Sequence, residues 1–488
     1  MTINLSGLGI DYGVILPELI VVGTAIVVLF MDLFVPPDRR TWLAVASAVG
    51  LLAAGVASIP LWGQSRAAFG DTVVGDSLAA FFDVLLLAVS IVTVAISPRF
   101  LRALDLDYGE YYILLLGATA GMMLLAAATS LMTIFLGIEL LSICLYVLSG
   151  FARTEQRSQE SALKYLLLGG FATGFLLYGM ALIYGATGST SLRGIAAFVG
   201  STNGAASNVV LLLGIGFLSV GLAFKASAAP FHMWTPDVYE GSPTIVTTFM
   251  SVATKSAAFA AVGRVFIATF PSLASQWYFA LALIAMLSLL IGNLVAITQD
   301  NLKRMLAYSG VAHAGYILLG VLPGTAQGFS ATVFYIAAYA VMNFGAFAVV
   351  TALGAAGEES ADLGYWRGLF YRRPFLATVM TIFMLSLAGI PPTVGFFAKL
   401  FVFQALVNAH LWAPLIVAVI MTIISFYYYL RVVVTMLATP DDLAPKPARV
   451  GVSTGTVLGA AAAATIVLGV FPTTVLDWAG RAAASLHF

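Results

Sequence analysis

The chain has 488 residues, of which 61% are hydrophobic and 9% are charged, whereas soluble globular proteins carry roughly 25% charged residues. Its 22 basic and 22 acidic residues balance without a basic tail, which argues against nucleic-acid binding. Cys144 is the only cysteine, which excludes an intrachain disulfide and any all-cysteine iron–sulfur or zinc site. The composition therefore predicts a polytopic membrane protein.

Apolar segments of about twenty residues recur along the whole chain, and each is long enough to cross a bilayer as a helix. No Lys or Arg precedes Arg39, so we expect the first segment to be a retained span, not a cleaved signal peptide. The pattern predicts an all-α membrane protein with about fourteen transmembrane helices. These lie near residues 16–35, 42–61, 77–97, 111–129, 131–150, 161–187, 208–234, 244–270, 276–299, 304–322, 327–355, 375–409, 412–437 and 452–472.

Basic residues outside the spans gather on one side of the predicted bundle. The connections after odd-numbered spans carry Arg39, Arg40, Arg99, Arg102, Arg153, Arg157, Lys303, Arg304, Arg367, Arg372, Arg373, Arg431, Lys446 and Arg449. The opposite side carries Arg66, Arg193, Arg264 and Arg481. The positive-inside rule then predicts that the odd connections are cytoplasmic and that both termini are extracytoplasmic.

Five ionisable residues lie inside the predicted spans, where charge is rare. They are Glu139, Lys164, Lys225, Lys255 and Lys399. Each would cost on the order of 2.5 to 3.5 kcal/mol at the centre of a membrane helix, so we expect them to face the protein interior and to serve transport. Snorkelling or a structural ion pair explains Lys164 equally well, because it is near the end of its span.

Two of the spans are interrupted by proline, and each carries one of these lysines. In FKASAAPFHMWTPDVYEGSP, Pro230 follows Lys225, and in GIPPTVGFFAKL, Pro391 and Pro392 precede Lys399. A broken membrane helix is tolerated where protein or water satisfies its free backbone groups. Because the breaks are five spans apart, the pattern predicts two inverted five-helix repeats with discontinuous seventh and twelfth helices.

This organisation divides the chain into four parts. We expect a three-helix segment over residues 1–110, a first repeat over 111–270, a second repeat over 271–437 and a C-terminal helix within 438–488. Tyr427, Tyr428 and Tyr429 lie beside Arg431, which is typical of an anchor at the membrane interface.

The two broken segments, together with AYSGVAHAGYILLG (307–320), resemble a known family. They are similar to the antiporter-like subunits of bacterial proton-pumping NADH:quinone oxidoreductase, respiratory complex I, and most closely to its subunit N group. The similarity covers spans four to thirteen and implies fourteen helices around a charged axis in the membrane plane. The functional positions of that family fall on Glu139, Lys164, Lys225, His232, Lys255, His313 and Lys399.

The resemblance also implies partners and a location. We expect a multi-pass protein of the bacterial plasma membrane that contacts lipid and the other membrane subunits of complex I, including neighbouring antiporter-like subunits. No dinucleotide fingerprint, flavin site or haem site is recognisable in the chain. NADH, FMN, iron–sulfur clusters and quinone are therefore expected in partner subunits. A subunit of a multisubunit cation/proton antiporter, or a scaffold with structural lysines, is the alternative.

The residue types suggest how protons could move. A lysine removed from water releases its proton more easily, and an approaching carboxylate reverses this by roughly 4 kcal/mol at about 4 Å. We therefore expect Glu139 to modulate a loading site at Lys225, Lys255 to relay protons laterally, and Lys399 to act on the exit side. His232 and His313 could bridge these groups as neutral imidazoles, although a histidine at depth is often structural.

Overall fold

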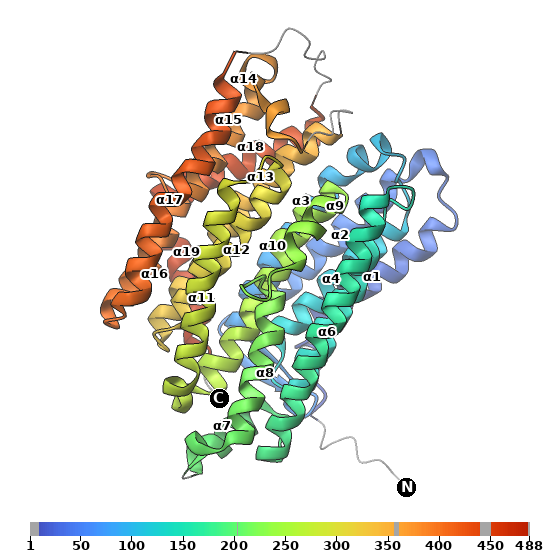
Figure 1. Cartoon of the computed structure of the whole chain (residues 1–488). Coiled ribbons are helices and arrows are strands. Elements are labelled where there is room, and N and C mark those ends of the chain that lie inside the picture. The colour runs from blue at the N-terminus through green and yellow to red at the C-terminus, as the bar shows by residue number, and fades with distance from the viewer. Residues whose placement is uncertain (1–8, 203, 356–360, 440–449, 487–488) are drawn as a thin grey trace.

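The computed structural model describes residues 9–202, 204–355, 361–439 and 450–486, and most of them are helical (Figure 1). Within these ranges, ten helical segments are long and apolar enough to cross a membrane. The first half contains α1 (Leu16–Asp32), α2 (Thr41–Ser58), α3 (Ser77–Ala103), α4 (Glu110–Ala127), α5 (Leu131–Ser149), α6 (Gln156–Thr187), α7 (Leu192–Ser201), α8 (Val209–Lys225), α9 (Trp234–Gly241) and α10 (Thr244–Val262). The second contains α11 (Ala274–Ile297), α12 (Leu302–Val321), α13 (Ala326–Gly354), α14 (Leu369–Arg372), α15 (Pro374–Ala388), α16 (Val394–Asn408), α17 (Trp412–Leu437), α18 (Val452–Val470) and α19 (Thr473–Ala484).

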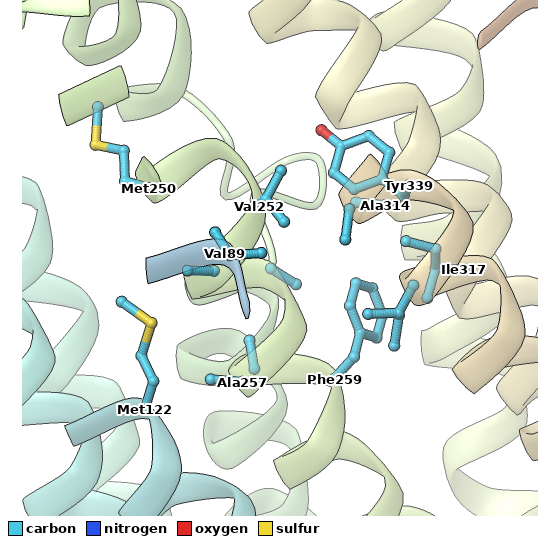
Figure 2. Packing of buried hydrophobic residues seen from close by; sticks show 14 of the residues in the cluster. Val89, Met122, Met250, Val252, Ala257, Phe259, Ala314, Ile317 and Tyr339 are labelled. Carbon is cyan, nitrogen blue, oxygen red and sulfur yellow. The ribbon is translucent and has the colours of Figure 1, made fainter. Parts of the chain in front are cut away.

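Helix α10 lies at the centre of the bundle, and every one of its residues is buried. It packs against α3 and α4 on one side and against α13 on the other. Figure 2 shows this arrangement, with Val89 and Met122 on one flank of α10 and Ala314, Ile317 and Tyr339 on the other. A helix that is buried on all sides needs no polar face toward solvent, so the polar residues of α10 must meet partners inside the protein.

The two predicted interruptions are present as breaks between helices. Helix α8 ends at Lys225 and α9 begins at Trp234, while α15 ends at Ala388 and α16 begins at Val394. Side chains satisfy some of the backbone groups that the first break frees. The Trp234 indole donates to the Phe224 carbonyl at 3.0 Å, and the Ala229 amide donates to Ser288 Oγ at 2.8 Å. These bonds make the interruption compatible with a buried position.

One loop of this predominantly helical protein contains a short β-hairpin that the sequence analysis did not predict. Strand β1 (Ser65–Ala68) pairs antiparallel with β2 (Val73–Asp76), with Ser65 opposite Asp76 and Ala68 opposite Val73. Gly70 has a φ of 69° in the turn between them. Four-residue strands are too short to show an alternating pattern in sequence, so the hairpin could not be read from hydropathy.

Asp76 ties this hairpin to the central helix. It accepts two hydrogen bonds of 2.9 Å from Arg264, in the π-helical segment Gly263–Thr269 that continues α10. Arg264 also donates to the Ala126 carbonyl at 2.6 Å, and both side chains are buried. The charge count placed Arg264 in a loop, but the structure places it inside the protein, where it joins the hairpin to the central helix. Lys446 and Arg449 from the same count lie outside the described residues.

Candidate functional site

Lys225 is the last residue of α8, and its side chain is almost fully buried. Its Nζ lies 5.3 Å from the ring centroid of Tyr165 and 5.8 Å from those of Tyr146 and Phe224. Among the described residues, Nζ has no hydrogen-bond partner. The aromatic faces and the negative end of the α8 dipole favour a cation here without fixing it by an ion pair.

Glu139 of α5 is half-buried and faces the neighbouring helix α6. The hydroxyl of Thr173 donates to its Oε1 at 2.8 Å. Glu139 and Lys225 interact electrostatically, but no ion pair within 4 Å joins them in the described part of the chain. The carboxylate is thus near enough to influence the lysine and is held on another helix.

Lys255 lies in the middle of α10 and is 1% exposed. Its Nζ donates to Tyr339 Oη of α13 at 3.4 Å. A Cβ atom on Gly310 of α12 would be 2.4 Å from Nζ, so the absence of a side chain at this glycine makes room for the ammonium. Three helices therefore shape the Lys255 site.

His313 of α12 is bonded through both ring nitrogens to tyrosine hydroxyls. Nδ1 is 2.8 Å from Tyr335 Oη, and Nε2 is 3.0 Å from Tyr429 Oη of α17. Tyr429 Oη is in turn hydrogen-bonded to Ser309. A neutral imidazole with one donor and one acceptor nitrogen can pass a proton along such a chain.

The same histidine lies between two of the predicted lysines. Its ring centroid is 5.1 Å from that of Tyr339, whose hydroxyl meets Lys255. The Tyr316 ring centroid is 6.0 Å from that of His313, and Lys399 Nζ lies 5.0 Å from the centroid of the Tyr316 ring. The structure thus brings Lys255, His313 and Lys399 together in one buried cluster.

Lys399 of α16 reaches back to the helix break. Its Nζ donates to the Ala388 carbonyl, the last of α15, at 2.7 Å. Gly389 follows with a φ of 92°, and a Cβ there would be 3.0 Å from Lys399 Cδ. Pro391 and Pro392 lie in the break and allow α15 to end at this point, so the carbonyl is free to accept the lysine.

Lys164 differs from the other lysines. Its side chain is 41% exposed and forms ion pairs of 2.7 Å with Glu160 and with Asp237 of α9. Asp237 is also bonded to Arg304 at 2.6 Å. This geometry agrees with the structural interpretation of Lys164, in which the ion pair with Asp237 joins α6 to α9.

His232 lies in the first break, which also contains Pro230. Its ring centroid is 6.2 Å from that of Tyr308 in α12, and its Nδ1 is buried without a hydrogen-bond partner in the described part of the chain. It faces α12 between the two repeats that the sequence predicts, as a bridging group would.

The tyrosine partners of His313 were not anticipated from the sequence. Tyr428 and Tyr429 are each 1% exposed, so the interpretation of residues 427–429 as an interfacial anchor is wrong for these two and fits only the exposed Tyr427. Tyr428 Oη donates to Asn293 Oδ1 at 2.9 Å. A tyrosine in an apolar run gives the same sequence pattern whether it packs in the core, anchors at the interface or relays protons. The partners of His313 lie on other helices, so their spacing from His313 in the sequence could not reveal the contact.

Comparison with known proteins assigns the family. Residues 128–425 match the family described as NADH:quinone oxidoreductase/Mrp antiporter, TM. Over 485 residues the chain is 45% identical to NADH-quinone oxidoreductase subunit N of Trichlorobacter lovleyi, and the alignment covers 99% of both chains. The chain belongs to the subunit N family of NADH-quinone oxidoreductase. The resemblance seen in the broken-helix motifs is therefore confirmed.

Solved structures agree with the subunit N assignment. A chain of respiratory complex I from Thermus thermophilus with bound aureothin matches with a TM-score of 0.81 and 36% identity, covering 94% of this chain and 98% of that one. A chain of the Mrp complex from Dietzia sp. matches with a TM-score of 0.84 at 24% identity, covering 96% of this chain and 97% of the other. At that identity the Mrp match reports the fold alone, so sequence relationship favours complex I over the antiporter alternative.

Proposed function

We propose that the chain moves protons across the membrane as a subunit of NADH-quinone oxidoreductase. The observation that carries the proposal is the buried tyrosine cluster around His313. His313 is bonded to Tyr335 and Tyr429, and its ring lies beside those of Tyr339 and Tyr316, which contact Lys255 and Lys399 respectively. Each proton moved against the membrane potential requires about 2.3 kcal/mol per 100 mV. Electron transfer from NADH to quinone in other subunits supplies that free energy.

Each ionisable group then has a role that suits its surroundings. Lys225 is the loading site, and Glu139 modulates its proton affinity from the neighbouring helix. Lys255 is the lateral relay and passes protons through His313 to Lys399 on the exit side. His232 and Lys164 are auxiliary: His232 bridges the first break to α12, and Lys164 tunes the loading site through its acidic partners.

The architecture that we infer has about fourteen spans, with α8–α9 and α15–α16 each counted as one broken span. Residues 111–270 and 271–437 form two inverted repeats, preceded by a three-helix segment (1–110) and followed by a C-terminal part (438–488). One lysine at each break supports this division. The charge bias supports cytoplasmic odd connections and extracytoplasmic termini in a bacterial plasma membrane.

The redox chemistry belongs to partner subunits in this proposal. NADH, FMN, the iron–sulfur clusters and quinone bind elsewhere in the complex, and this chain contacts neighbouring membrane subunits and lipid. It receives a conformational or electrostatic signal and responds by moving protons.

The decisive experiment measures NADH-driven proton pumping in membrane vesicles for Lys225→Ala and Lys399→Ala. Assembly is checked on a native gel, and Arg66→Ala serves as a control, because its exposed ion pair with Asp11 should contribute at most about 1 kcal/mol. We expect both buried variants to assemble while pumping and quinone-linked turnover fall together. Normal pumping by both assembled variants would contradict the lysine relay and favour a scaffold.

A further inference from the structure

One face of α10 carries a row of polar residues that leads to Lys255. Thr244, Thr248, Ser251 and Lys255 follow one another at spacings of four, three and four residues, which places them on the same side of the helix. All four are at most 1% exposed. In a helix surrounded by apolar packing, four buried polar side chains on one face need partners.

Helix α13 supplies partners for three of these four residues, as three successive rungs. Thr248 Oγ1 is 2.9 Å from Thr351 Oγ1, Asn343 Nδ2 donates to Ser251 Oγ at 3.0 Å, and Lys255 Nζ donates to Tyr339 Oη at 3.4 Å. We call this set of residues, with Thr244, the α10–α13 seam. From one pair to the next, the residue numbers rise along α10 and fall along α13. The seam therefore runs along one interface between two antiparallel helices.

A polar cavity of about 360 Å³ opens at the outer end of the seam. Its walls include Thr244 and Val350, the residue that precedes Thr351. The remaining wall lies on the side that is rich in basic residues and includes Arg157 at the start of α6, Glu240 near the end of α9 and Asn301 at the N-cap of α12. At about 30 Å³ per water molecule, the cavity has room for roughly ten waters.

The inner part of the seam contains a polar atom that no protein group satisfies. Asn343 is fully buried, and its Oδ1 has no hydrogen-bond partner among the described residues. Such an atom costs about 1 to 3 kcal/mol unless water bonds to it. Asn343 is one helical turn from Tyr339 on α13, so a water bonded to its Oδ1 would lie close to the Lys255 site.

We infer that the α10–α13 seam is the path by which protons reach Lys255 from the cavity on the basic side of the protein. This inference rests on the proposed function and refines it: Lys255 takes up its proton through the seam, and the charge at Lys225 drives that proton onward, so the loss of either lysine still stops transport. Hydroxyl groups both donate and accept hydrogen bonds, so Thr248, Thr351 and Ser251 can pass a proton on with one or two waters. The seam contains no carboxylate, the ligand that Ca²⁺ and Mg²⁺ sites ordinarily use, and it ends at the amine of Lys255.

The alternative is that the rungs only hold α10 and α13 together. Hydrogen bonds between membrane helices stabilise packing by roughly 0.6 to 2 kcal/mol each, and Thr248 also bonds within its own helix to the Thr244 carbonyl. The two roles differ in how they respond to the size and polarity of residue 343. Leucine fills the site without polarity, whereas serine is smaller and leaves space for water.

The test compares Asn343→Leu, Asn343→Ser and Thr248→Val in the complete enzyme in membrane vesicles, with assembly checked on a native gel. The readouts are protons pumped and NADH-to-quinone turnover. Thr254→Val is the matched control, since Thr254 is buried in the same helix and its hydroxyl bonds, among the described residues, only to the Met250 carbonyl. Thr248→Val removes a hydroxyl at constant shape and serves if Asn343→Leu fails to assemble.

We expect Asn343→Leu and Thr248→Val to lower pumping by at least about tenfold, a modest loss for a proton-transfer group. Asn343→Ser should pump better than Asn343→Leu, and Thr254→Val should match the parent. A packing role predicts instead that Asn343→Leu pumps better than Asn343→Ser, and that result would overturn the inference. Parental pumping by assembled Asn343→Leu and Thr248→Val would overturn it as well. Lys255→Ala distinguishes failure of the proposed function from failure of this inference. Normal pumping by Lys255→Ala would contradict the lysine relay, whereas an inactive Lys255→Ala together with active seam variants would contradict only the path through the seam.

Discussion

Each buried lysine keeps its ammonium in the protein interior by a different device. Lys225 has aromatic faces and a helix C-terminus, Lys255 has a tyrosine hydroxyl and a glycine that makes room, and Lys399 has a freed backbone carbonyl. Within the described residues, none of the three forms an ion pair. A carboxylate in direct contact would hold the proton on the lysine, so these weaker partners are consistent with the proposed role of each lysine in proton exchange.

Tyr429→Phe tests whether the hydroxyl network matters more than the ring. The change removes the group that meets His313 Nε2 at 3.0 Å and leaves that nitrogen buried without its partner, at a cost of about 1 to 3 kcal/mol. We expect the complex to assemble and proton pumping in vesicles to fall at least about tenfold. Tyr427→Phe is the control, because Tyr427 is 61% exposed and two residues away. Equal activity of the two variants would argue against a relay through Tyr429.

At the scale of helices, hydropathy and proline anticipated most of the arrangement. Every predicted apolar segment is helical over most of its length, and both breaks occur at the predicted prolines. The amphipathic α7 and α19 were not predicted, because helices of ten and twelve residues are too short to register as spans. The partners of His313 and Lys255 were also not predicted. They come from helices distant in the sequence, and hydropathy does not show which helix faces contact one another.

Gly389 offers a way to separate backbone strain at a break from the position of its lysine. Alanine at this glycine would adopt a φ of 92° and place its Cβ 3.0 Å from Lys399 Cδ. Gly188→Ala is a matched control: its φ is 70° at the end of α6, and no atom of the described residues beyond its immediate surroundings lies within 4 Å of an added Cβ. Both substitutions should cost about 1 to 2 kcal/mol of strain, measurable as earlier thermal loss of the assembled complex.

Only Gly389→Ala should also disturb transport. We expect its pumping per electron to fall several-fold while that of Gly188→Ala stays parental, because only the former displaces the Lys399 side chain. Parental pumping by an assembled Gly389→Ala would show that the exact position of Lys399 at the break is unimportant.

At the scale of the whole molecule, the two halves meet in one buried core. Helix α10 contacts α3 and α4 on one side and α13 on the other, and Lys255 lies at that junction. The contacts that connect Lys255, His313 and Lys399 therefore join one predicted repeat to the other. Such an arrangement favours a single path that both halves share, in contrast to one independent path in each half.

A double variant distinguishes these possibilities. In a single path, Lys225→Ala or Lys399→Ala alone interrupts every proton, so the double variant should pump no less than the weaker single variant. In two parallel paths, each single variant keeps about half of the parental pumping and the double variant loses the rest. The measurement is protons pumped per electron in vesicles at matched assembly, since non-additive losses are expected when groups act as one unit. The two lysines lie at breaks five predicted spans apart. Equal losses of pumping in the single and double variants would therefore show that the same proton depends on both breaks.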